Sequence, residues 1–139
     1  NLLIGESTAE KIKKEIGTAI PTTNNIFLMK GRDIRTGTPK EIALTEEDAC
    51  EALMPILNQM LSAIKEALES TPPELSADLV DMGLVLTGGG ALLKNIDKLI
   101  SKDTGLPVTI ADNPLECVAI GTGKALENEE LFSTMMSEY

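Results

Sequence analysis

Three consecutive glycines, Gly88 to Gly90, are the residues whose spacing most directly suggests chemistry in this sequence. They follow the apolar run Leu84 to Leu86, which is typical of a strand buried on both faces, and they precede a helical pattern that begins at Ala91. Free N–H groups at a helix N-terminus, with the helix dipole, favour an anion such as phosphate. Glycines carry no Cβ and also let a flat ligand approach the backbone. The alternative is a tight strand–helix connection that binds nothing.

The glycine turn matches only part of the dinucleotide-binding fingerprint, G-x-G-x-x-G/A. Gly88 and Gly90 fit its first two positions, and Asp112 follows at a plausible distance for an acidic group that contacts a ribose. Leu93 occupies the third glycine position, where a bulky side chain would push helix and strand apart. The phosphate loop G-x-x-x-x-G-K-[ST] does not occur in the sequence. Neither motif is therefore assigned.

Composition excludes several classes of function. The 139 residues carry a formal net charge of −10, so the phosphate backbone of a nucleic acid would be repelled. The sequence has no histidine, which excludes a Ser-His-Asp triad, and Cys50 and Cys117 lack the spacing of zinc ligands. Two cysteines in apolar helical patterns fit a reducing compartment, and we expect both to be small buried hydrophobes. No metal site and no catalytic residue are predicted.

Hydrophobic periodicity predicts an α+β arrangement with an aliphatic core. A capping box at Ser7–Glu10 is expected to start the first helix, and Thr45–Asp48 the longest one. Small residues at 119, 121 and 123 suggest close backbone packing in the last helix. No stretch approaches the roughly 20 apolar residues of a membrane-spanning helix. Strands are predicted over 25–30, 32–35, 41–45, 84–86 and 108–111, and helices over 7–17, 45–70, 73–81, 91–102 and from 112 onwards.

Several stretches, in this order, match one family. They are NLLIGESTAEKIKKEIG (1–17), GRD (31–33), TPPEL (71–75), GLVLTGGGALL (83–93), TGLPV (104–108), and the run from 113 that includes GTGKAL (121–126). With these motifs, which span nearly the whole chain, the sequence resembles the C-terminal half of the MreB family, the rod-shape-determining actin homologues of bacteria. It departs from the family at 22–25 and 129–139. The chain starts without Met or a signal peptide and is expected to be an excised piece.

The resemblance implies an actin-like ATPase fold, of α/β class, with four subdomains around a nucleotide cleft. This chain would be an α+β fragment of that fold. Residues 1–17 would form a cleft helix that leads out of the larger subdomain, and residues 18–81 the small outer subdomain, with a β-meander and helices. Residues 82–127 would be part of the larger subdomain with the glycine adenosine loop, and residues 128–139 a tail.

The resemblance also implies two adenosine-contacting stretches. A long lysine stem beside a purine, with a polar head at the purine's edge, is chemically sensible, although charge pattern alone describes this helix face as solvated. The glycine loop would supply Gly88, Gly89, Gly90, Ala91 and Leu92, and the opposite wall would supply Glu10, Lys11, Ile12 and Lys13. ATP is the implied cofactor. In the family the phosphate hairpins, and the acidic groups that place Mg²⁺ and the attacking water, lie upstream of this region.

As a function, the resemblance implies that the parent protein is a cytoskeletal ATPase that polymerises into filaments on the cytoplasmic, inner face of the cell membrane. Its filaments would maintain a rod shape by guiding cell-wall synthesis. The implied partners are further copies of itself, cell-wall synthesis proteins and membrane-anchoring proteins, and the membrane would be reached through parts outside this chain. Nucleic acid is not among them. The alternative is an acidic α+β protein-interaction module with a structural glycine turn and no nucleotide.

Overall fold

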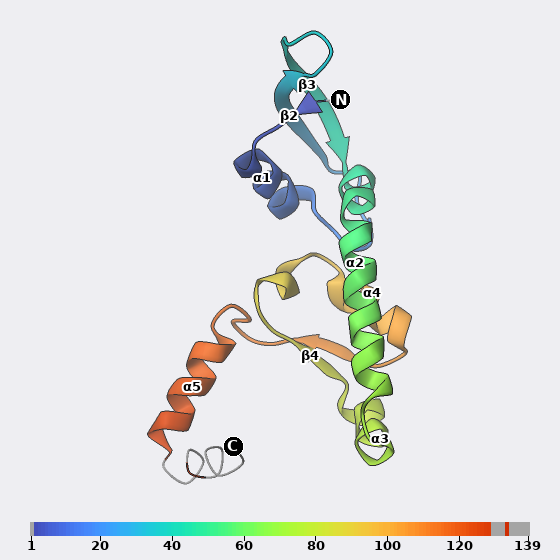
Figure 1. The fold of residues 1–139 in the computed structure, drawn as a ribbon, viewed down its shortest axis with the longest axis vertical. Coiled ribbons are helices and arrows are strands. Elements are labelled where there is room, and N and C mark those ends of the chain that lie inside the picture. The colour runs from blue at the N-terminus through green and yellow to red at the C-terminus, as the bar shows by residue number, and fades with distance from the viewer. Residues whose placement is uncertain (1, 129–132, 134–139) are drawn as a thin grey trace.

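A computed structural model describes residues 2–128 and 133 of the chain. The molecule is elongated, and the long helix α2 connects an upper lobe (residues 2–45) to a lower lobe (residues 73–114), from which α5 extends (Figure 1). The elements are β1 Leu2–Leu3, α1 Glu6–Ile16, β2 Ile26–Asp33, β3 Pro39–Thr45, α2 Glu46–Glu69, α3 Pro73–Met82, β4 Leu84–Leu86, the 3₁₀ turn η1 Gly89–Leu92, α4 Ile96–Thr104, β5 Val108–Ile110 and α5 Cys117–Glu127.

The upper lobe contains a three-stranded antiparallel sheet in the order β1-β2-β3. The predicted strands at 25–30 and 41–45 are confirmed as the β2–β3 hairpin, but the strand predicted at 32–35 is wrong. The Asp33 carboxylate accepts hydrogen bonds from the N–H groups of Arg35 and Thr36, and Gly37 has a φ of +72°. This local bonding turns the chain after β2, and the short N-terminal strand β1 is the third strand instead.

Helix α1 packs beneath this sheet, and its start differs from the prediction. It begins at Glu6 with Gly5 as N-cap and has no side-chain cap, so the capping box expected between Ser7 and Glu10 does not form. Glu10 instead pairs with lysines further along the helix, as described below. The predicted end at Gly17 is confirmed, and a Cβ at this position would collide with the Lys13 carbonyl oxygen.

Helix α2 begins at the predicted capping box. The Thr45 hydroxyl accepts a hydrogen bond from the Asp48 N–H, and the Asp48 carboxylate accepts one from the Thr45 N–H. Pro73 is the first residue of α3, as predicted. Cys50 is buried in α2 as expected, whereas Cys117 is only half-buried, and both are free thiols.

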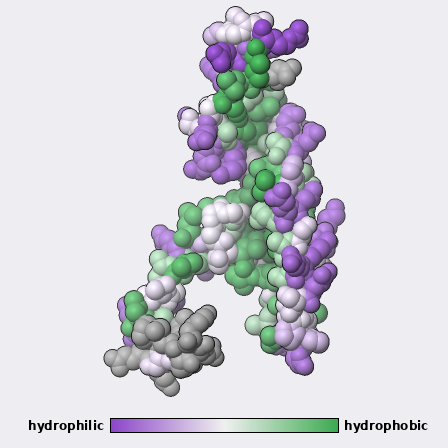
Figure 2. Space-filling view, in the orientation of Figure 1, coloured by the Kyte–Doolittle hydropathy of each residue, from purple (hydrophilic) through white to green (hydrophobic). Residues whose placement is uncertain are grey.

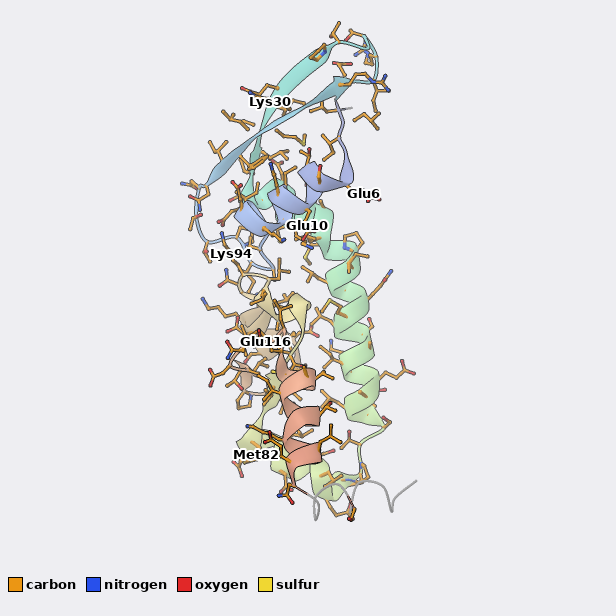
Figure 3. The ribbon with its side chains drawn as sticks, turned by 90° about the vertical axis from the view of Figure 1, so that its left-hand side faces the viewer. Glu6, Glu10, Lys30, Met82, Lys94 and Glu116 are labelled. Atoms are coloured by element: carbon orange, nitrogen blue, oxygen red, sulfur yellow. The ribbon has the colours of Figure 1, made fainter. Side chains whose placement is uncertain are left out.

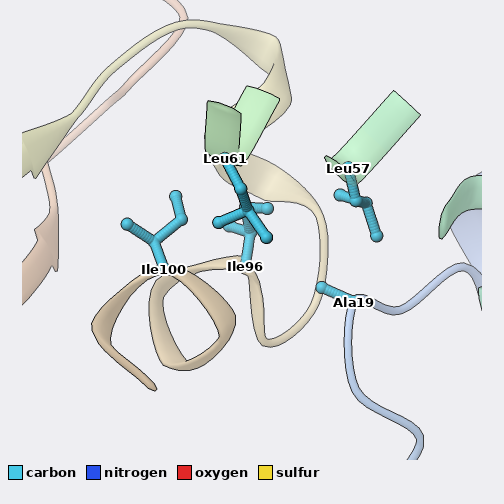
Figure 4. Close-up of a cluster of buried hydrophobic side chains, with 5 residues drawn as sticks. All are labelled: Ala19, Leu57, Leu61, Ile96 and Ile100. Atoms are coloured by element: carbon cyan, nitrogen blue, oxygen red, sulfur yellow. The ribbon is translucent and has the colours of Figure 1, made fainter. Parts of the chain in front are cut away.

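Two buried clusters, built from aliphatic side chains as predicted, hold the molecule together. The upper cluster joins α1, β2 and α2, and the lower cluster joins α2, α4 and the linker after α1 (Figure 4). Their members are Ile12, Ile16, Met29 and Ala49 above, and Ala19, Leu57, Leu61, Ile96 and Ile100 below. Because α2 contributes to both clusters, it fixes the two lobes relative to each other. The predicted division into 1–17, 18–81, 82–127 and 128–139 stays a prediction.

The lower lobe contains the predicted strands β4 and β5 as a two-stranded parallel sheet, with Leu84 opposite Val108. Leu84 and Leu86 pack on the lower cluster. The expected burial of β4 on both faces is wrong within the described chain, because Val85 is 63% exposed. β5 is the only strand paired with β4 there, which leaves the other edge of β4 without a neighbouring strand in the described chain.

The last helix, α5, begins later than predicted. Asn113 has a φ of +50° and the following residues form a turn, so the helix starts at Cys117 instead of at 112–114. No described atom lies within 4 Å of a Cβ built on Gly121 or Gly123, so the close packing expected there is not made. Val118 is 79% exposed. Apart from residues 128 and 133, the predicted tail lies outside the described residues.

Candidate functional site

The glycine turn leads from β4 into η1, not directly into a helix. Gly88 has a φ of +79°, and its N–H donates to the Pro114 carbonyl at 2.7 Å. The helix predicted from Ala91 is wrong at its start, because α4 begins only at Ile96. Asn95 takes a left-handed conformation, with a φ of 60°, and this interrupts the helical run. The α-helix expected directly after the glycines is thus replaced by a 3₁₀ turn, and an anion site at the glycines stays a prediction.

The structure requires glycine to a different degree at each of the three positions of the turn. Gly88 needs its positive φ, which side-chain-bearing residues rarely adopt. A Cβ on Gly89 would lie 3.3 Å from Leu115 Cδ2, a contact that a flexible side chain can relieve. At Gly90 a Cβ would meet no atom within 4 Å, and φ is not positive. The tight turn therefore explains why residue 88 is a glycine. It does not explain Gly90, where bare backbone faces open space.

A cavity of about 580 Å³ lies between α1 and the glycine turn. Figure 2 shows the hollow between the two lobes on this side of the molecule. Its back wall is apolar and consists of Leu53, Ile56 and Met60 on α2. A largely apolar cleft with a few polar groups at its rim is the usual form of a small-molecule site.

The structure brings together five of the nine residues that the resemblance assigns to adenosine. Ile12 is instead buried in the upper cluster, Ala91 is buried beneath the turn, Gly88 is half-buried at its start, and Lys11 is exposed on another part of α1. The residues that line the cavity are Glu10, Lys13, Gly89, Gly90 and Leu92. A nucleotide-binding role for all nine stays a prediction.

The rim contributed by α1 is charged. Glu10 Oε2 lies 2.7 Å from Lys13 Nζ, and Glu10 Oε1 lies 3.4 Å from Lys14 Nζ. The hydrogen bond from Lys13 is the main cause that lowers the pKa of Glu10, so this carboxylate is ionised near neutral pH. Figure 3 shows Glu10 on the face of α1 that points toward the lower lobe. A fixed carboxylate beside a lysine stem offers both an acceptor and an apolar surface to a ligand.

Sequence reasoning missed the apolar wall on α2 and the residue that follows the turn. Ile56 is 57% exposed and Met60 38% exposed, although both lie beside the buried face of α2. The sequence did contain a signal for this wall. Ile56 and Met60 are four residues apart and lie beside Leu53 and Leu57, so the apolar face of α2 is wider than packing against the core alone requires. Lys94 also lines the cavity, and nothing in its sequence context indicated this.

Another cavity, of about 630 Å³, lies between α1, the upper sheet and the start of α2. Ile4, Met29 and Leu44 are among its lining residues. Glu10, Ile12 and Lys13 also line this cavity, but the glycine turn does not, so only the cavity between the lobes contains residues of both predicted stretches.

The described residues contain no group of three or more cysteine or acidic side chains that could hold a metal ion. They therefore offer no dedicated metal site made of protein side chains alone; Mg²⁺ in nucleotide sites is usually held by one or two carboxylates, waters and the phosphates. Among the same residues, no helix combines the length and the apolar character needed to cross a membrane.

Comparison with known proteins gives one consistent result. The family model described as MreB/Mbl protein matches residues 1–134. The cell shape-determining protein Mbl of Bacillus cereus is 50% identical over 128 residues, which cover 91% of this chain and 38% of that protein. The cell shape-determining protein MreB of Escherichia coli is 49% identical over 126 residues, which cover 90% of this chain and 36% of that protein. The chain thus spans little more than a third of these curated relatives.

Solved structures agree with the sequence matches. MreB5 of Spiroplasma citri bound to ADP superposes with a TM-score of 0.86 at 38% identity, over 90% of this chain and 38% of that one. The same protein bound to AMPPNP gives 0.88 at 34% identity, over 100% and 41%. A non-polymerising mutant of MamK bound to AMPPNP shares the fold, with a TM-score of 0.61 at 23% identity, over 83% and 35%. The fold is that of part of an actin-like protein, and the chain belongs to the MreB/Mbl family.

Proposed function

We propose that this chain supplies the adenosine side of the ATP site in a bacterial actin-like cytoskeletal protein. The whole protein would bind ATP, assemble head to tail into filaments on the inner face of the cell membrane, and hydrolyse ATP as the filament ages. Its filaments would guide cell-wall synthesis and so determine rod shape. The observation that carries the proposal is the cavity between α1 and the glycine turn, with open space over Gly90.

The two sides of the cavity suit the two faces of a nucleoside. Bare backbone at Gly89 and Gly90 lets a flat ring come close, as no side chain of the turn stands in the way at Gly90. Glu10 and Lys13 place a hydrogen-bond acceptor and a long apolar stem on the opposite side. The solved structures of MreB5 hold ADP or AMPPNP, which supports a nucleotide as the occupant here.

One wall of a nucleotide site is not a complete ATPase. Charge-assisted contacts to the phosphates and Mg²⁺ contribute most of the affinity for a triphosphate. The described residues offer no metal site, so those contacts would come from the rest of the protein. Residues 1–139 alone should therefore bind ATP weakly and should not hydrolyse it.

Self-assembly is the second part of the proposal. Head-to-tail contacts are heterologous and build open filaments instead of closed rings. The tip of the β2–β3 hairpin is suited to such a contact because it presents the exposed charges Arg32 and Arg35 on a short, ordered turn. The net charge of −10 disfavours contact between identical surfaces of this chain, so assembly should need a complementary surface elsewhere in the protein. Cell-wall synthesis proteins and membrane anchors would be further partners.

Gly90→Ala in the full-length protein tests the nucleotide site. The added methyl group meets no protein atom within 4 Å, so the thermal midpoint should stay unchanged, while ATP would lose the space it needs. We expect ATP affinity to fall about tenfold, as overpacking by one methyl group costs about 1–3 kcal/mol.

Gly5→Ala is the matched control, because its Cβ also meets open space and Gly5 lies at the start of α1, outside the cavity. Calorimetric titration with ATP and thermal unfolding would be measured on the same samples. Unchanged ATP affinity in a folded Gly90→Ala protein would refute the proposed site.

A further inference from the structure

Lys94 connects the two walls of the cavity. It follows the glycine turn in sequence, and its ammonium donates a 2.7 Å hydrogen bond to the carbonyl oxygen of Glu15. Glu15 lies in the last turn of α1, where backbone carbonyls have no partner within the helix. A positive charge at a helix C-terminus is also favoured by the helix dipole. Lys94 therefore holds the lower wall to the end of the upper wall.

The backbone around Lys94 strengthens this connection. Its carbonyl accepts hydrogen bonds from the Ala19 N–H at 2.8 Å and from the Thr18 hydroxyl at 3.2 Å. The neighbouring Asn95 amide donates to Thr18 Oγ1 at 3.1 Å and to the Ile20 carbonyl at 2.9 Å. Thr18 is completely buried. The junction is thus a closed hydrogen-bond network, and the Lys94 side chain is its exposed outer member.

This outer member lies at the cavity. Lys94 is among the lining residues, together with Gly17 at the end of α1 and Gly90 in the turn. Figure 3 places Lys94 where α1 meets the lower lobe, on the same side of the molecule as Glu10. Its stem faces the cavity region while its ammonium is occupied by α1.

We propose that Lys94 is a positioning residue of the nucleotide site, which fixes the separation of α1 and the glycine turn. A flat ring gains contacts on both faces only if the two walls are held at the separation that admits it, and holding them before binding lowers the entropic cost of ordering them. The Lys94 side chain is at the surface, and the buried backbone network persists without its ammonium. Its loss should therefore affect ligand fit more than folding. The inference rests on the proposed function.

Lys94→Met in the full-length protein removes the ammonium and keeps an apolar stem, and Lys94→Arg keeps a cationic donor. We expect ATP affinity to fall about fivefold in Lys94→Met, because the two walls must then be ordered when the ligand binds, and to recover to within about twofold in Lys94→Arg. The thermal midpoint without nucleotide should fall by no more than about 1 °C in Lys94→Met, because the contact with α1 is exposed. Lys98→Met, an exposed lysine of α4 that does not line the cavity, is the matched control for the lost charge.

The outcomes separate the two claims. Equal ATP affinity in the wild type and Lys94→Met would overturn the positioning role and leave the ATP site intact. An affinity loss accompanied by a matching fall in thermal midpoint would also overturn it, because it would show a general structural role. A wild-type full-length protein that binds no ATP would overturn the proposed function and this inference together. Loss in Lys94→Met with rescue by Lys94→Arg and a normal midpoint supports the proposal.

Discussion

The two walls of the cavity are built in opposite ways. The lower wall includes a stretch of bare backbone, since Gly89 and Gly90 present no side chain to the open space. The upper wall is side chain, since Glu10 and Lys13 reach from α1 and keep about half of their side-chain surface exposed. A ligand can approach a backbone wall only because no side chain is present there, whereas a side-chain wall contacts a ligand through the atoms of its side chains.

This difference decides what substitutions do. If a nucleotide occupies the cavity as proposed, any side chain added to the lower wall enters the volume of that ligand, so even a methyl group there should weaken binding strongly. Exposed ion pairs such as Glu10–Lys13 contribute little to folding, so changes to the upper wall should act on the ligand alone. The position of the upper wall also depends on the linker that follows α1. The carboxylate of Glu46 holds this linker through hydrogen bonds.

Glu46→Gln should have the largest effect, because it releases the linker that positions α1. Glu46 is 1% exposed, and its carboxylate accepts hydrogen bonds from the N–H groups of Thr22 and Thr23 and from the Thr23 hydroxyl, at 2.7–3.1 Å. Glutamine keeps one acceptor oxygen, but its NH₂ group cannot accept the bonds made by the other carboxylate oxygen. We expect the thermal midpoint of the full-length protein to fall by about 5 °C near pH 7.

The pH dependence of the same variant gives a second measurement. The Thr23 hydroxyl, followed by the N–H groups of Thr22 and Thr23, lowers the pKa of Glu46 from 4.5 to about 2. A lowered folded-state pKa contributes stability above pH 4.5 that is lost as the pH falls toward 2, since the unfolded chain takes up the proton first. The difference in stability between wild type and Glu46→Gln should therefore shrink on acidification. A difference that stays constant from pH 7 to pH 3 would contradict the role of this carboxylate.

Particular residues show how far sequence reasoning reached. The capping box at Thr45 and the start of α3 at Pro73 were predictable because both depend on bonds within a few residues of the chain. Asn95 was not, since its left-handed conformation is held by Thr18 and Ile20, more than 70 positions away. The same long-range contacts explain why the start of α4 was predicted wrongly and why the position of Lys94 at the cavity was not predicted.

The exposed surfaces of β4 and α5 were mispredicted for another reason. The apolar run of β4 indicates a buried position for Val85, and the small residues of α5 indicate close packing, but the described chain provides neither. Five of the nine residues that the family resemblance named line the cavity between the lobes, whereas Ile12 and Lys11 do not. A stretch of helix contributes only one face to a site, and periodicity assigns Ile12 to the core face.

Lys13→Met should have an intermediate effect and sharpens the contrast between the walls. It removes an exposed ion pair with Glu10, so the thermal midpoint should move by no more than about 1 °C. ATP affinity should fall about threefold, because the Glu10 carboxylate loses its nearest partner while the apolar stem is retained. Calorimetric titration of the full-length protein with ATP measures this.

Lys11→Met is the control for that experiment. Lys11 lies on the same helix two residues away, is exposed, and does not line the cavity. Its substitution should leave ATP affinity unchanged. If Lys11→Met weakens ATP binding as much as Lys13→Met, the upper wall acts through its total charge and not through the side chains that reach the cavity.

Arg32→Glu combined with Arg35→Glu should have the smallest effect on either wall, because the end of β2 and the turn after it lie at the far tip of the upper lobe, remote from the glycine turn (Figure 1). The Asp33 carboxylate orders the turn through the N–H groups of Arg35 and Thr36, so the backbone there does not depend on the two side chains. The charge reversal should therefore leave the thermal midpoint unchanged and the ATP affinity within about twofold of wild type, because exposed charges far from a site are screened over about 8 Å at physiological salt.

If the hairpin tip contacts the next subunit, the same change should impair filament growth, and more strongly at low salt. Sedimentation of the full-length double variant with ATP measures this, and pelleting equal to wild type at low salt would exclude the hairpin tip from the filament contact.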